Sequence, residues 1–493
     1  MKLPVGTEDM PKRPNVLFLI DDQHRHDVLG YAGDDVVRTP TLDSLAETGT
    51  VFTNAYTPSP ICVPARQSIR TGQLPQTWDR FGIEAFESGY RTMGRQFAEY
   101  GYMTASAGKM HYPGLAQMQG WRKRIGPTPM KRAVENAPYD VQEEPEYSDR
   151  DYGGFSDWKW SQSKEIKRAG VGTSRVQVQD RRSVEGTEQF LKQYFAAPYY
   201  DRSQPGRPLF LQTSLIQPHY PFFSEFEDRL TFYLERVDPY VEQPQDFHPN
   251  LDCGRQAIPG EDVSEREIRR ATAAYYAMVE TVDDLFGNVL DTLRHLGEDL
   301  DEWVIVFTSD HGEMLGERSL WEKVRFWEAS ANVPLIIRYP ERFDPETVTE
   351  NVTLCDLYAT LCDLCNLPVP PELDSRSLVP LLAGDTSVWH ERYDNEAISQ
   401  GARNDSVADD IDTEELMIKQ EGLKYCYYGE DVSEVLFDLE RDPDETMNYT
   451  DDPEYADTIA QFRERRSELG YGPDGDPDYA TAGYDPGVMV DER

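Results

Sequence analysis

The sequence predicts an α/β protein with a large mixed, mostly parallel sheet sandwiched by helices and a small antiparallel C-terminal subdomain. Short apolar runs of strand length recur along the chain, and amphipathic helical stretches separate them, which predicts the sheet. After about Trp389 the pattern changes to short strand-like segments, of which Leu423 to Tyr428 and Val435 to Leu439 are the clearest. We therefore expect a main domain over residues 1–388 and a subdomain with an acidic tail over 389–493.

Four of the apolar runs are each followed closely by chemically reactive side chains. They are Val16 to Ile20, before Asp21-Asp22; Tyr102 to Ser106, before Gly108-Lys109-Met110-His111; Leu209 to Thr213, before Gln217-Pro218-His219; and Trp303 to Thr308, before Ser309-Asp310-His311. In an open parallel sheet the carboxyl ends of the strands lie on one edge, which is where ligands bind. The sequence therefore predicts that these four clusters meet at one site.

The stretch from Ser264 to Gly297 is the best-marked helix. Ser264 and Glu267 form a capping box at its start, and Gly297 is a C-terminal stop. Its apolar residues recur at helical spacing and predict a face packed against the core. The stretch from about 122 to 205, by contrast, is polar and lacks a clear period, which predicts insertions and loops over the sheet edge.

The composition excludes several classes of protein. Hydrophobic residues make up 39% of the 493 residues, enough for a large core, and no apolar run reaches the roughly 20 residues that span a membrane. Met1 to Asn15 lacks the apolar segment of a secretory signal, so we expect a cytoplasmic location and no membrane partner. The net charge of −41 argues against a nucleic-acid partner. Because this charge is spread along the chain, it favours halophilic adaptation to a saline cytoplasm over an acidic partner-binding surface.

The six cysteines are too sparse for a disulfide scaffold. Cys362 and Cys365 fall in an amphipathic helical pattern, which favours buried structural thiols over a redox or metal pair. Cys62 differs, because Pro64 suits the first turn of a helix and Gly72 suits its stop. Cys62 would then lie at a helix N-terminus, where partial positive charge favours an anion. A thiolate nucleophile and a buried thiol are the alternatives for this residue.

Two acidic pairs follow predicted strands. Asp21-Asp22 and Asp310-His311 can converge on a hard divalent cation, since carboxylates suit calcium, magnesium or manganese. Acidic pairs are common in a chain with 90 Asp and Glu, so either pair alone reads as a helix cap or loop. Their placement after apolar strands is what indicates a metal site.

The motifs together make the chain resemble the formylglycine-dependent sulfatases of the alkaline-phosphatase superfamily. Cys62-x-Pro64-x-Arg66, ending in Thr71-Gly72, looks like the signature whose cysteine is oxidised to formylglycine. The other elements follow in the family's order: Gly108-Lys109-Met110-His111, Pro218-His219-Tyr220-Pro221, Ser309 to Gly316 with Leu320-Trp321-Glu322-Lys323, and Leu436-Phe437-Asp438-Leu439, in which Phe437 replaces the usual tyrosine. They span nearly the whole chain.

This resemblance implies the chemistry and the residues that perform it. A hydrated formylglycine made from Cys62 would attack sulfur through one hydroxyl, and its second hydroxyl would allow sulfate to be eliminated. Arg66 and Lys109 would anchor the formylglycine, and His111 would be the base for its second hydroxyl. His219 and Lys323 would hold the sulfate and protonate the leaving oxygen.

The resemblance also implies a cofactor and partners. The cofactor is one divalent metal ion, with Ca²⁺ favoured over Mg²⁺ or Mn²⁺, and its ligands would be Asp21, Asp22, Cys62, Asp310 and His311. The partners are a small-molecule sulfate ester and a formylglycine-generating enzyme that matures Cys62, and a homo-oligomer is left open. Asp22 is the main N-terminal ligand by motif spacing, while either Asp21 or Gln23 could be its neighbour.

Three functions follow from this resemblance. Sulfuric ester hydrolysis is the leading hypothesis, and the motifs are most similar to the choline-sulfatase and phosphonate monoester hydrolase branches. A phosphonate monoester hydrolase or phosphodiesterase is the alternative enzyme, and a non-catalytic binding protein is the second class. Aromatic residues in the polar stretch could cage a quaternary ammonium, with ordinary packing as the alternative; they are Tyr139, Tyr147, Tyr152, Phe155, Trp158 and Trp160.

Overall fold

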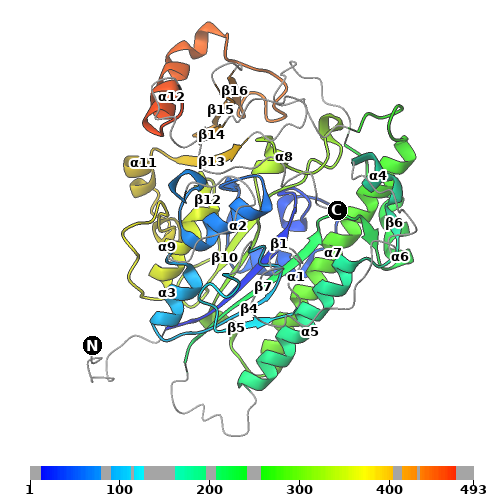
Figure 1. The fold of residues 1–493 in the computed structure, drawn as a ribbon, viewed down its shortest axis with the longest axis vertical. Coiled ribbons are helices and arrows are strands. Elements are labelled where there is room, and N and C mark those ends of the chain that lie inside the picture. The colour runs from blue at the N-terminus through cyan, green and yellow to red at the C-terminus, as the bar shows by residue number, and fades with distance from the viewer. Residues whose placement is uncertain are drawn as a thin grey trace.

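The computed structural model describes residues 13–78, 90–112, 116–126, 162–195, 207–240, 257–402, 414–429 and 434–472. Its centre is an eight-stranded sheet of order β11-β2-β10-β9-β1-β7-β4-β5 (Figure 1). The strands are β1 Asn15–Asp22, β2 Thr50–Phe52, β4 Met103–Gly108, β5 Lys123–Ile125, β7 Leu209–Pro218, β9 Trp303–Ser309, β10 Leu335–Arg338 and β11 Glu346–Val348.

The four predicted strands are the middle of this sheet. β9, β1, β7 and β4 are consecutive neighbours, and all three pairings between them are parallel. Only β10 runs antiparallel to its neighbours, β9 and β2, so the sheet is mixed but mostly parallel, as predicted. The register pairs Asp21 with Ser309 and Asp22 with Pro218, which brings the ends of three strands to one edge.

Alternate residues of β1 enter two separate hydrophobic cores because side chains of a strand point to opposite faces. Val16, Phe18 and Ile20 pack with residues from α2, α3 and α9, whereas Leu17 and Leu19 pack with residues from α1, α5 and α7. These helices form the two layers that sandwich the sheet (Figure 1). Their bounds are α1 Pro40–Glu47, α2 Cys62–Thr71, α3 Met93–Glu99, α5 Arg175–Phe195, α7 Glu265–His295 and α9 Leu357–Leu364.

The helix predicted between Ser264 and Gly297 is confirmed as α7. Ser264 is the N-cap and forms the capping box with Glu267, and the helix turns at Gly297, where φ is +80°. Twenty of its residues are buried, which agrees with a core-facing helix. Cys362 and Cys365, at the end of α9, are fully buried, and burial raises the pKa of both thiols. They are the structural thiols that the sequence indicated.

The prediction of loops between about 122 and 205 was wrong for the described residues, because α5 spans 21 of them. Its buried face is largely polar, with Gln177, Asp180, Ser183 and Thr187 among the buried side chains. This face carries few apolar residues, so it gave no hydrophobic period to detect. Asp180 accepts the backbone N–H groups of Ile216 and Gln217 at 2.8 and 2.9 Å, which ties α5 to the end of β7.

A four-stranded antiparallel sheet forms the predicted C-terminal subdomain and lies at one end of the molecule with α12 (Figure 1). The elements are β13 Glu396–Ala402, β14 Glu414–Gln420, β15 Leu423–Tyr427, β16 Val435–Asp438 and α12 Ala456–Glu468. The division of the chain at residue 388 stays a prediction.

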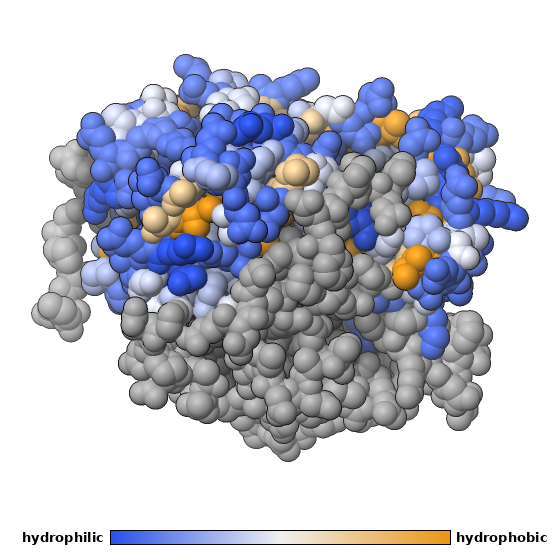
Figure 2. Space-filling view, turned by 90° about the horizontal axis from the view of Figure 1, so that it is seen from above, coloured by the Kyte–Doolittle hydropathy of each residue, from blue (hydrophilic) through white to orange (hydrophobic). Residues whose placement is uncertain are grey.

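Shorter elements complete the fold: β3 Ala55–Tyr56, β6 Gly170–Val171, β8 Phe223–Ser224, β12 Val352–Thr353, α4 Gln162–Arg168, α6 Glu227–Leu234, α8 Glu328–Ala331, α10 Val379–Leu382 and α11 Ser387–Tyr393. Among the described residues, none of the helices has the length and apolar character needed to cross a bilayer. Hydrophobic residues are scattered among hydrophilic ones on the described part of the face in Figure 2.

Candidate active site

Cys62 is the first residue of α2, as the sequence predicted, and is 5% exposed. The helix ends at Gly72, whose φ of +66° suits glycine, and a Cβ there would lie 2.9 Å from the Tyr358 ring. The N-terminus of α2 therefore presents Cys62 at the edge of the sheet where β1 and β9 end. A helix N-terminus carries partial positive charge, which suits the binding of an anion.

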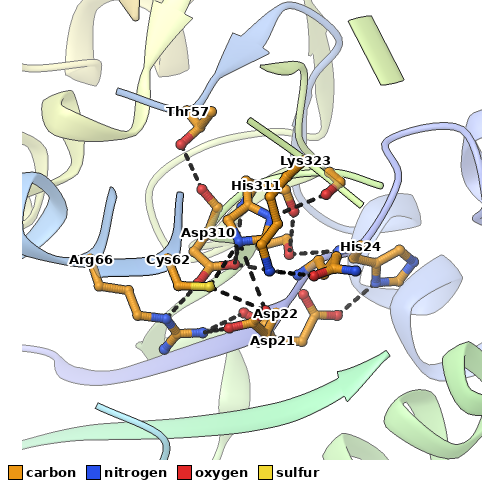
Figure 3. A network of polar contacts seen from close by, with 12 residues as sticks. Asp21, Asp22, His24, Thr57, Cys62, Arg66, Asp310, His311 and Lys323 are labelled. Atoms are coloured by element: carbon orange, nitrogen blue, oxygen red, sulfur yellow. Dashed lines mark hydrogen bonds and ion pairs between the residues drawn. The ribbon is translucent and has the colours of Figure 1, made fainter. Parts of the chain in front are cut away.

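Four of the predicted metal ligands meet around Cys62. One donor atom from each of Asp22, Cys62, Asp310 and His311 lies within 4.8 Å of the other three, and all four residues are buried (Figure 3). The His311 Nδ1 lies 3.0 Å from the carbonyl oxygen of Gly312. Since a carbonyl only accepts, Nδ1 carries the proton and Nε2 keeps its lone pair toward the group. The imidazole is thus oriented as metal-binding histidines usually are.

The two carboxylates of this group have opposite pKa shifts. Burial raises the pKa of Asp310 to about 7, and the negative charge of Asp22 adds to the effect although Arg66 opposes it. Burial also disfavours the charged form of Asp22, but Lys109, His219 and Arg66 outweigh it and hold the pKa of Asp22 well below its usual value. Two carboxylates buried side by side disfavour each other's charged form, and nearby positive charge relieves this effect.

The donor set fits a divalent cation. The two carboxylates are ligands that calcium, magnesium and manganese sites use, and an imidazole of fixed tautomer is a ligand that transition-metal ions accept. A cation between Asp22 and Asp310 would also supply the charge that the raised pKa of Asp310 calls for. The residues present therefore fit the metal that the sequence implied.

Arg66 and Lys109 organise the group from the other side. The Arg66 guanidinium donates to Asp310 Oδ2 at 2.6 Å, to Asp22 Oδ2 at 3.2 Å and to Ser214 Oγ at 2.8 Å. The Lys109 ammonium also pairs with Asp22 Oδ2. Lys109 is held because its backbone N–H donates to the Ser214 carbonyl at 3.1 Å. Ser214 follows the predicted strand by one residue, and only its place at a strand end could have signalled this role.

The remaining predicted catalytic residues surround the Cys62 sulfur. His311 Nε2 lies 3.1 Å from Sγ, and His111 and His219 lie close enough to the thiol to interact with it electrostatically. Burial alone would raise the pKa of Cys62, but the positive charges of Lys109 and Lys323 lower it well below its usual value. The position of residue 62 is thus adapted to a negatively charged or strongly polar group. Burial and the charge of Lys323 lower the pKa of His219 to about 4.

Asp21 and Gln23, the two candidates for an additional ligand, lie outside the four-residue group. Asp21 Oδ2 lies 2.6 Å from His24 Nδ1, while its buried Oδ1 has no hydrogen-bond partner among the described residues (Figure 3). Asp21 has the parity of Leu17 and Leu19, so its side chain leaves β1 on the face opposite Asp22. The Gln23 side chain instead joins Lys323 to Glu313. The role of Asp21 as a ligand stays a prediction.

The proposed aromatic cage lies outside the described residues, since all six of its rings fall between 127 and 161. Sequence reasoning also missed Glu313, which is fully buried three residues after Asp310. Its only sequence signal was its place within the motif that contains Asp310 and His311.

Comparison with known proteins identifies the family. A family model described as "Sulfatase" matches residues 14–367, and one described as "N-sulphoglucosamine sulphohydrolase, C-terminal" matches 316–470. A choline-sulfatase of Rhizobium meliloti is 32% identical over 472 residues, covering 92% of this chain and 86% of that protein. An arylsulfatase of Clostridium perfringens is 26% identical over 477 residues, covering 92% and 93%.

A solved structure shares the fold. The phosphonate monoester hydrolase of Agrobacterium radiobacter superimposes with a TM-score of 0.74 at 22% identity, covering 93% of this chain and 95% of that one. The family match over most of the chain, together with a curated relative above 30% identity, establishes that this protein belongs to the sulfatase family of sulfuric ester hydrolases.

Proposed function

We propose that this sulfatase hydrolyses a small sulfate monoester, with choline sulfate as the first candidate, through a formylglycine made from Cys62 and one divalent metal ion. The choice of choline sulfate is supported by the similarity to a choline-sulfatase over 92% of the chain. The maturing partner would be a formylglycine-generating enzyme. Calcium is the favoured ion, with magnesium and manganese as alternatives for the same donor set.

One observation carries the proposal: a buried residue at a helix N-terminus, Cys62, is surrounded by acidic metal-ligand candidates on one side and by cations on the other. A sulfate ester needs this combination, because negative charge develops on the transferred group and on the leaving oxygen. A thiol kept only for packing is buried among apolar side chains, as Cys365 is. Cys62 instead lies 3.1 Å from His311 Nε2 and in the field of two lysines.

The side chains around Cys62 have separable roles in this proposal. The Arg66 guanidinium donates to Asp22, Asp310 and Ser214. It would therefore orient the two proposed metal ligands and the formylglycine at position 62. His111, which lies close enough to residue 62 to interact with it electrostatically, would remove the proton from its second hydroxyl. His219, which follows β7, and Lys323, which lies between β9 and β10, would hold the sulfate and protonate the leaving oxygen.

The metal would be held by Asp22, Asp310, His311 and the modified residue 62, with Asp21 adjacent. When bound, such a cation supplies Lewis-acid stabilisation of charge on the sulfate oxygens. Residues 1–388 would form the sulfatase catalytic domain and 389–493 the subdomain. We also propose a halophilic, cytoplasmic enzyme, supported by the net charge of −41.

Turnover of four esters tests this function directly. Protein shown by mass spectrometry to carry formylglycine at position 62 would be assayed in high salt with Ca²⁺, Mg²⁺ or Mn²⁺ added. The substrates are choline sulfate, an aryl sulfate, an aryl phosphonate monoester and a phosphodiester, and Cys62→Ala is the blank. We expect the highest kcat/KM for choline sulfate.

The other outcomes discriminate between the alternatives. A preference for the aryl sulfate would keep the reaction and reject choline as the alcohol. A preference for either phosphorus ester would move the function to the phosphonate monoester hydrolase alternative. An unmodified thiol in protein from the native host would favour the non-catalytic binding protein.

A further inference from the structure

The loop that carries Lys323 has a disfavoured backbone. Between 315 and 324, five residues other than glycine have φ between +50° and +80°, a region that side chains with a Cβ rarely adopt. They are Leu315, Arg318, Ser319, Glu322 and Val324. Such a backbone persists only where the surrounding structure fixes it, and it concentrates at functional sites. Some group must therefore hold this loop in the conformation that delivers Lys323.

The Glu313 carboxylate holds both ends of that loop. Its Oε1 accepts the backbone N–H of Leu315 at 2.8 Å and that of Glu322 at 2.5 Å. The loop is closed beside it by the Met314 N–H, which donates to the Glu322 carbonyl at 2.7 Å. One carboxylate oxygen thus fixes the residue that immediately precedes Lys323.

The second oxygen of Glu313 reaches Lys323 by another route. Oε2 accepts from the Gln23 amide nitrogen, and Gln23 Oε1 accepts from the Lys323 ammonium at 2.6 Å. The amide has one workable orientation here, because a carboxylate only accepts and an ammonium only donates. Gln23 and Glu313 are fully buried and Lys323 is 7% exposed. Water therefore competes little for these hydrogen bonds.

We infer that Glu313 is a positioning residue for Lys323, acting through Gln23 and through the two backbone N–H groups of the loop. The inference rests on the proposed function, in which Lys323 holds the sulfate and protonates the leaving oxygen.

Replacing Glu313 by glutamine conserves its size and breaks this arrangement. With the new amide oxygen on the two backbone N–H groups, the new NH₂ group would face the NH₂ group of Gln23, and both only donate. Gln23 would then have to turn over, which would place its NH₂ group against the Lys323 ammonium. Gln23 therefore loses either its anchor on residue 313 or its contact with Lys323.

Aryl sulfates with leaving phenols of graded pKa test the inference. We would measure kcat/KM for wild type, Glu313→Gln, Lys323→Ala and the double variant. Loss of proton donation hurts poor leaving groups most, so Glu313→Gln should lower kcat/KM about 10²-fold for phenyl sulfate and less than about tenfold for nitrophenyl sulfate. In the Lys323→Ala background the same change should add less than about threefold, because the two residues act as a unit.

Glu280→Gln is the matched control. Glu280 is a buried acid on α7 that binds Arg38 and Tyr233, and none of these three residues belongs to the loop that carries Lys323. The control should leave the leaving-group dependence unchanged. The inference would be overturned if Glu313→Gln lowered kcat/KM equally for all esters and if its effect added in full to that of Lys323→Ala in the double variant. Loss of bound metal, measured by atomic absorption, would also overturn it, because it would show that Glu313 supports the metal group instead.

A crystal structure of Glu313→Gln separates failure of this inference from failure of the proposed function. If Lys323 has moved away from Gln23 in the variant, the positioning role of Glu313 is supported. Two kinetic results would count against the proposed function alone: no turnover of any sulfate ester, or an unchanged leaving-group dependence in Lys323→Ala. Lys323 and Gln23 unmoved in the variant would overturn the inference whatever the activity.

Discussion

Two clusters of buried charge share the segment between β9 and β10, and they are built differently. At the active site, Asp22 and Asp310 meet Cys62 and His311, and one donor atom from each of the four lies within 4.8 Å of the others. At the contact with the C-terminal sheet, Lys424 of β15 is fully buried and its three donors are all used. They go to the Phe326 carbonyl at 2.7 Å, to Glu328 Oε1 at 2.9 Å and to Glu445.

The difference indicates that the first cluster serves the reaction, whereas the Lys424 cluster attaches the C-terminal sheet. Side chains with metal-ligand donors that converge on one point are typical of functional sites, because a metal or substrate supplies their remaining partner. A buried network of paired charges matters for stability mainly when one partner is removed. The remaining charges are then buried without a counter-charge, which destabilises the fold. The active-site cluster should therefore respond to mutation in rate, and the Lys424 cluster in stability.

The largest expected effect is loss of rate without loss of fold. Cys62→Ala should lower kcat by about 10⁵-fold or more, because it removes the group that attacks the ester. Its melting temperature should stay near that of wild type, since alanine is a good helix former. Cys365→Ala, which removes a buried structural thiol, should do the reverse. Activity retained by Cys62→Ala would contradict the proposed chemistry.

The second effect tests the other cluster. Lys424→Met should destabilise the protein by about 3–5 kcal/mol, because Glu328 and Glu445 would be left buried without their cation. Denaturant unfolding monitored by fluorescence measures it, with Lys192→Met as the control. Lys192 is 60% exposed, and its ion pair among the described residues is with Glu188, so its loss should cost less than about 1 kcal/mol. Equal costs for the two variants would remove the distinction between the clusters.

The third prediction sharpens the roles inside the active site. His111→Ala should lower kcat by about 10²-fold and let sulfated enzyme accumulate, because it removes the base that we propose for the second hydroxyl. Mass spectrometry of the peptide that carries residue 62, after rapid quenching, would detect the added sulfate. His295→Ala, an exposed histidine at the end of α7, should behave as wild type. Normal turnover by His111→Ala would reject the assignment.

The smallest expected effect concerns a hydrogen bond that supports the cluster. Ser214→Ala removes the acceptor of Arg66 and should lower kcat/KM about tenfold, since a hydrogen bond to a charged group contributes about 1.5–3 kcal/mol. Steady-state kinetics with the preferred ester measure it. Ser224→Ala, at a buried serine that donates to the Phe226 carbonyl, should not change kcat/KM. Indistinguishable kinetics for the two variants would show that Arg66 needs no such anchor.

The sequence predicted the sheet and most of the site because their signals are local. Apolar runs mark buried strands, and the polar residues after each run reach one edge when the strands are parallel. The start of α2 at Cys62 and its end at Gly72 follow from proline and glycine preferences in the same way. The capping box of α7 is equally local, since Ser264 and Glu267 are three residues apart.

What lies around these motifs was decided by packing. Helix α5 went unrecognised because its buried face is polar and pairs with the end of β7 through Asp180, a contact between residues more than thirty positions apart. From the sequence alone, Lys424 would be expected at the surface, because lysines are rarely buried. Its burial is tolerable because of partners from another part of the chain, such as Glu328.

By itself, the sequence determined which residue types stand at the strand ends; the tertiary structure decided which of them face one another. Asp21 and Asp22 are adjacent and chemically identical, yet they leave β1 on opposite faces. Only the helices packed on each face determine that Asp22 meets Cys62 and Arg66 while Asp21 meets His24. The same holds for Glu313, because its hydrogen bonds to Gln23 and to the loop of Lys323 exist only once β1 and β9 lie side by side.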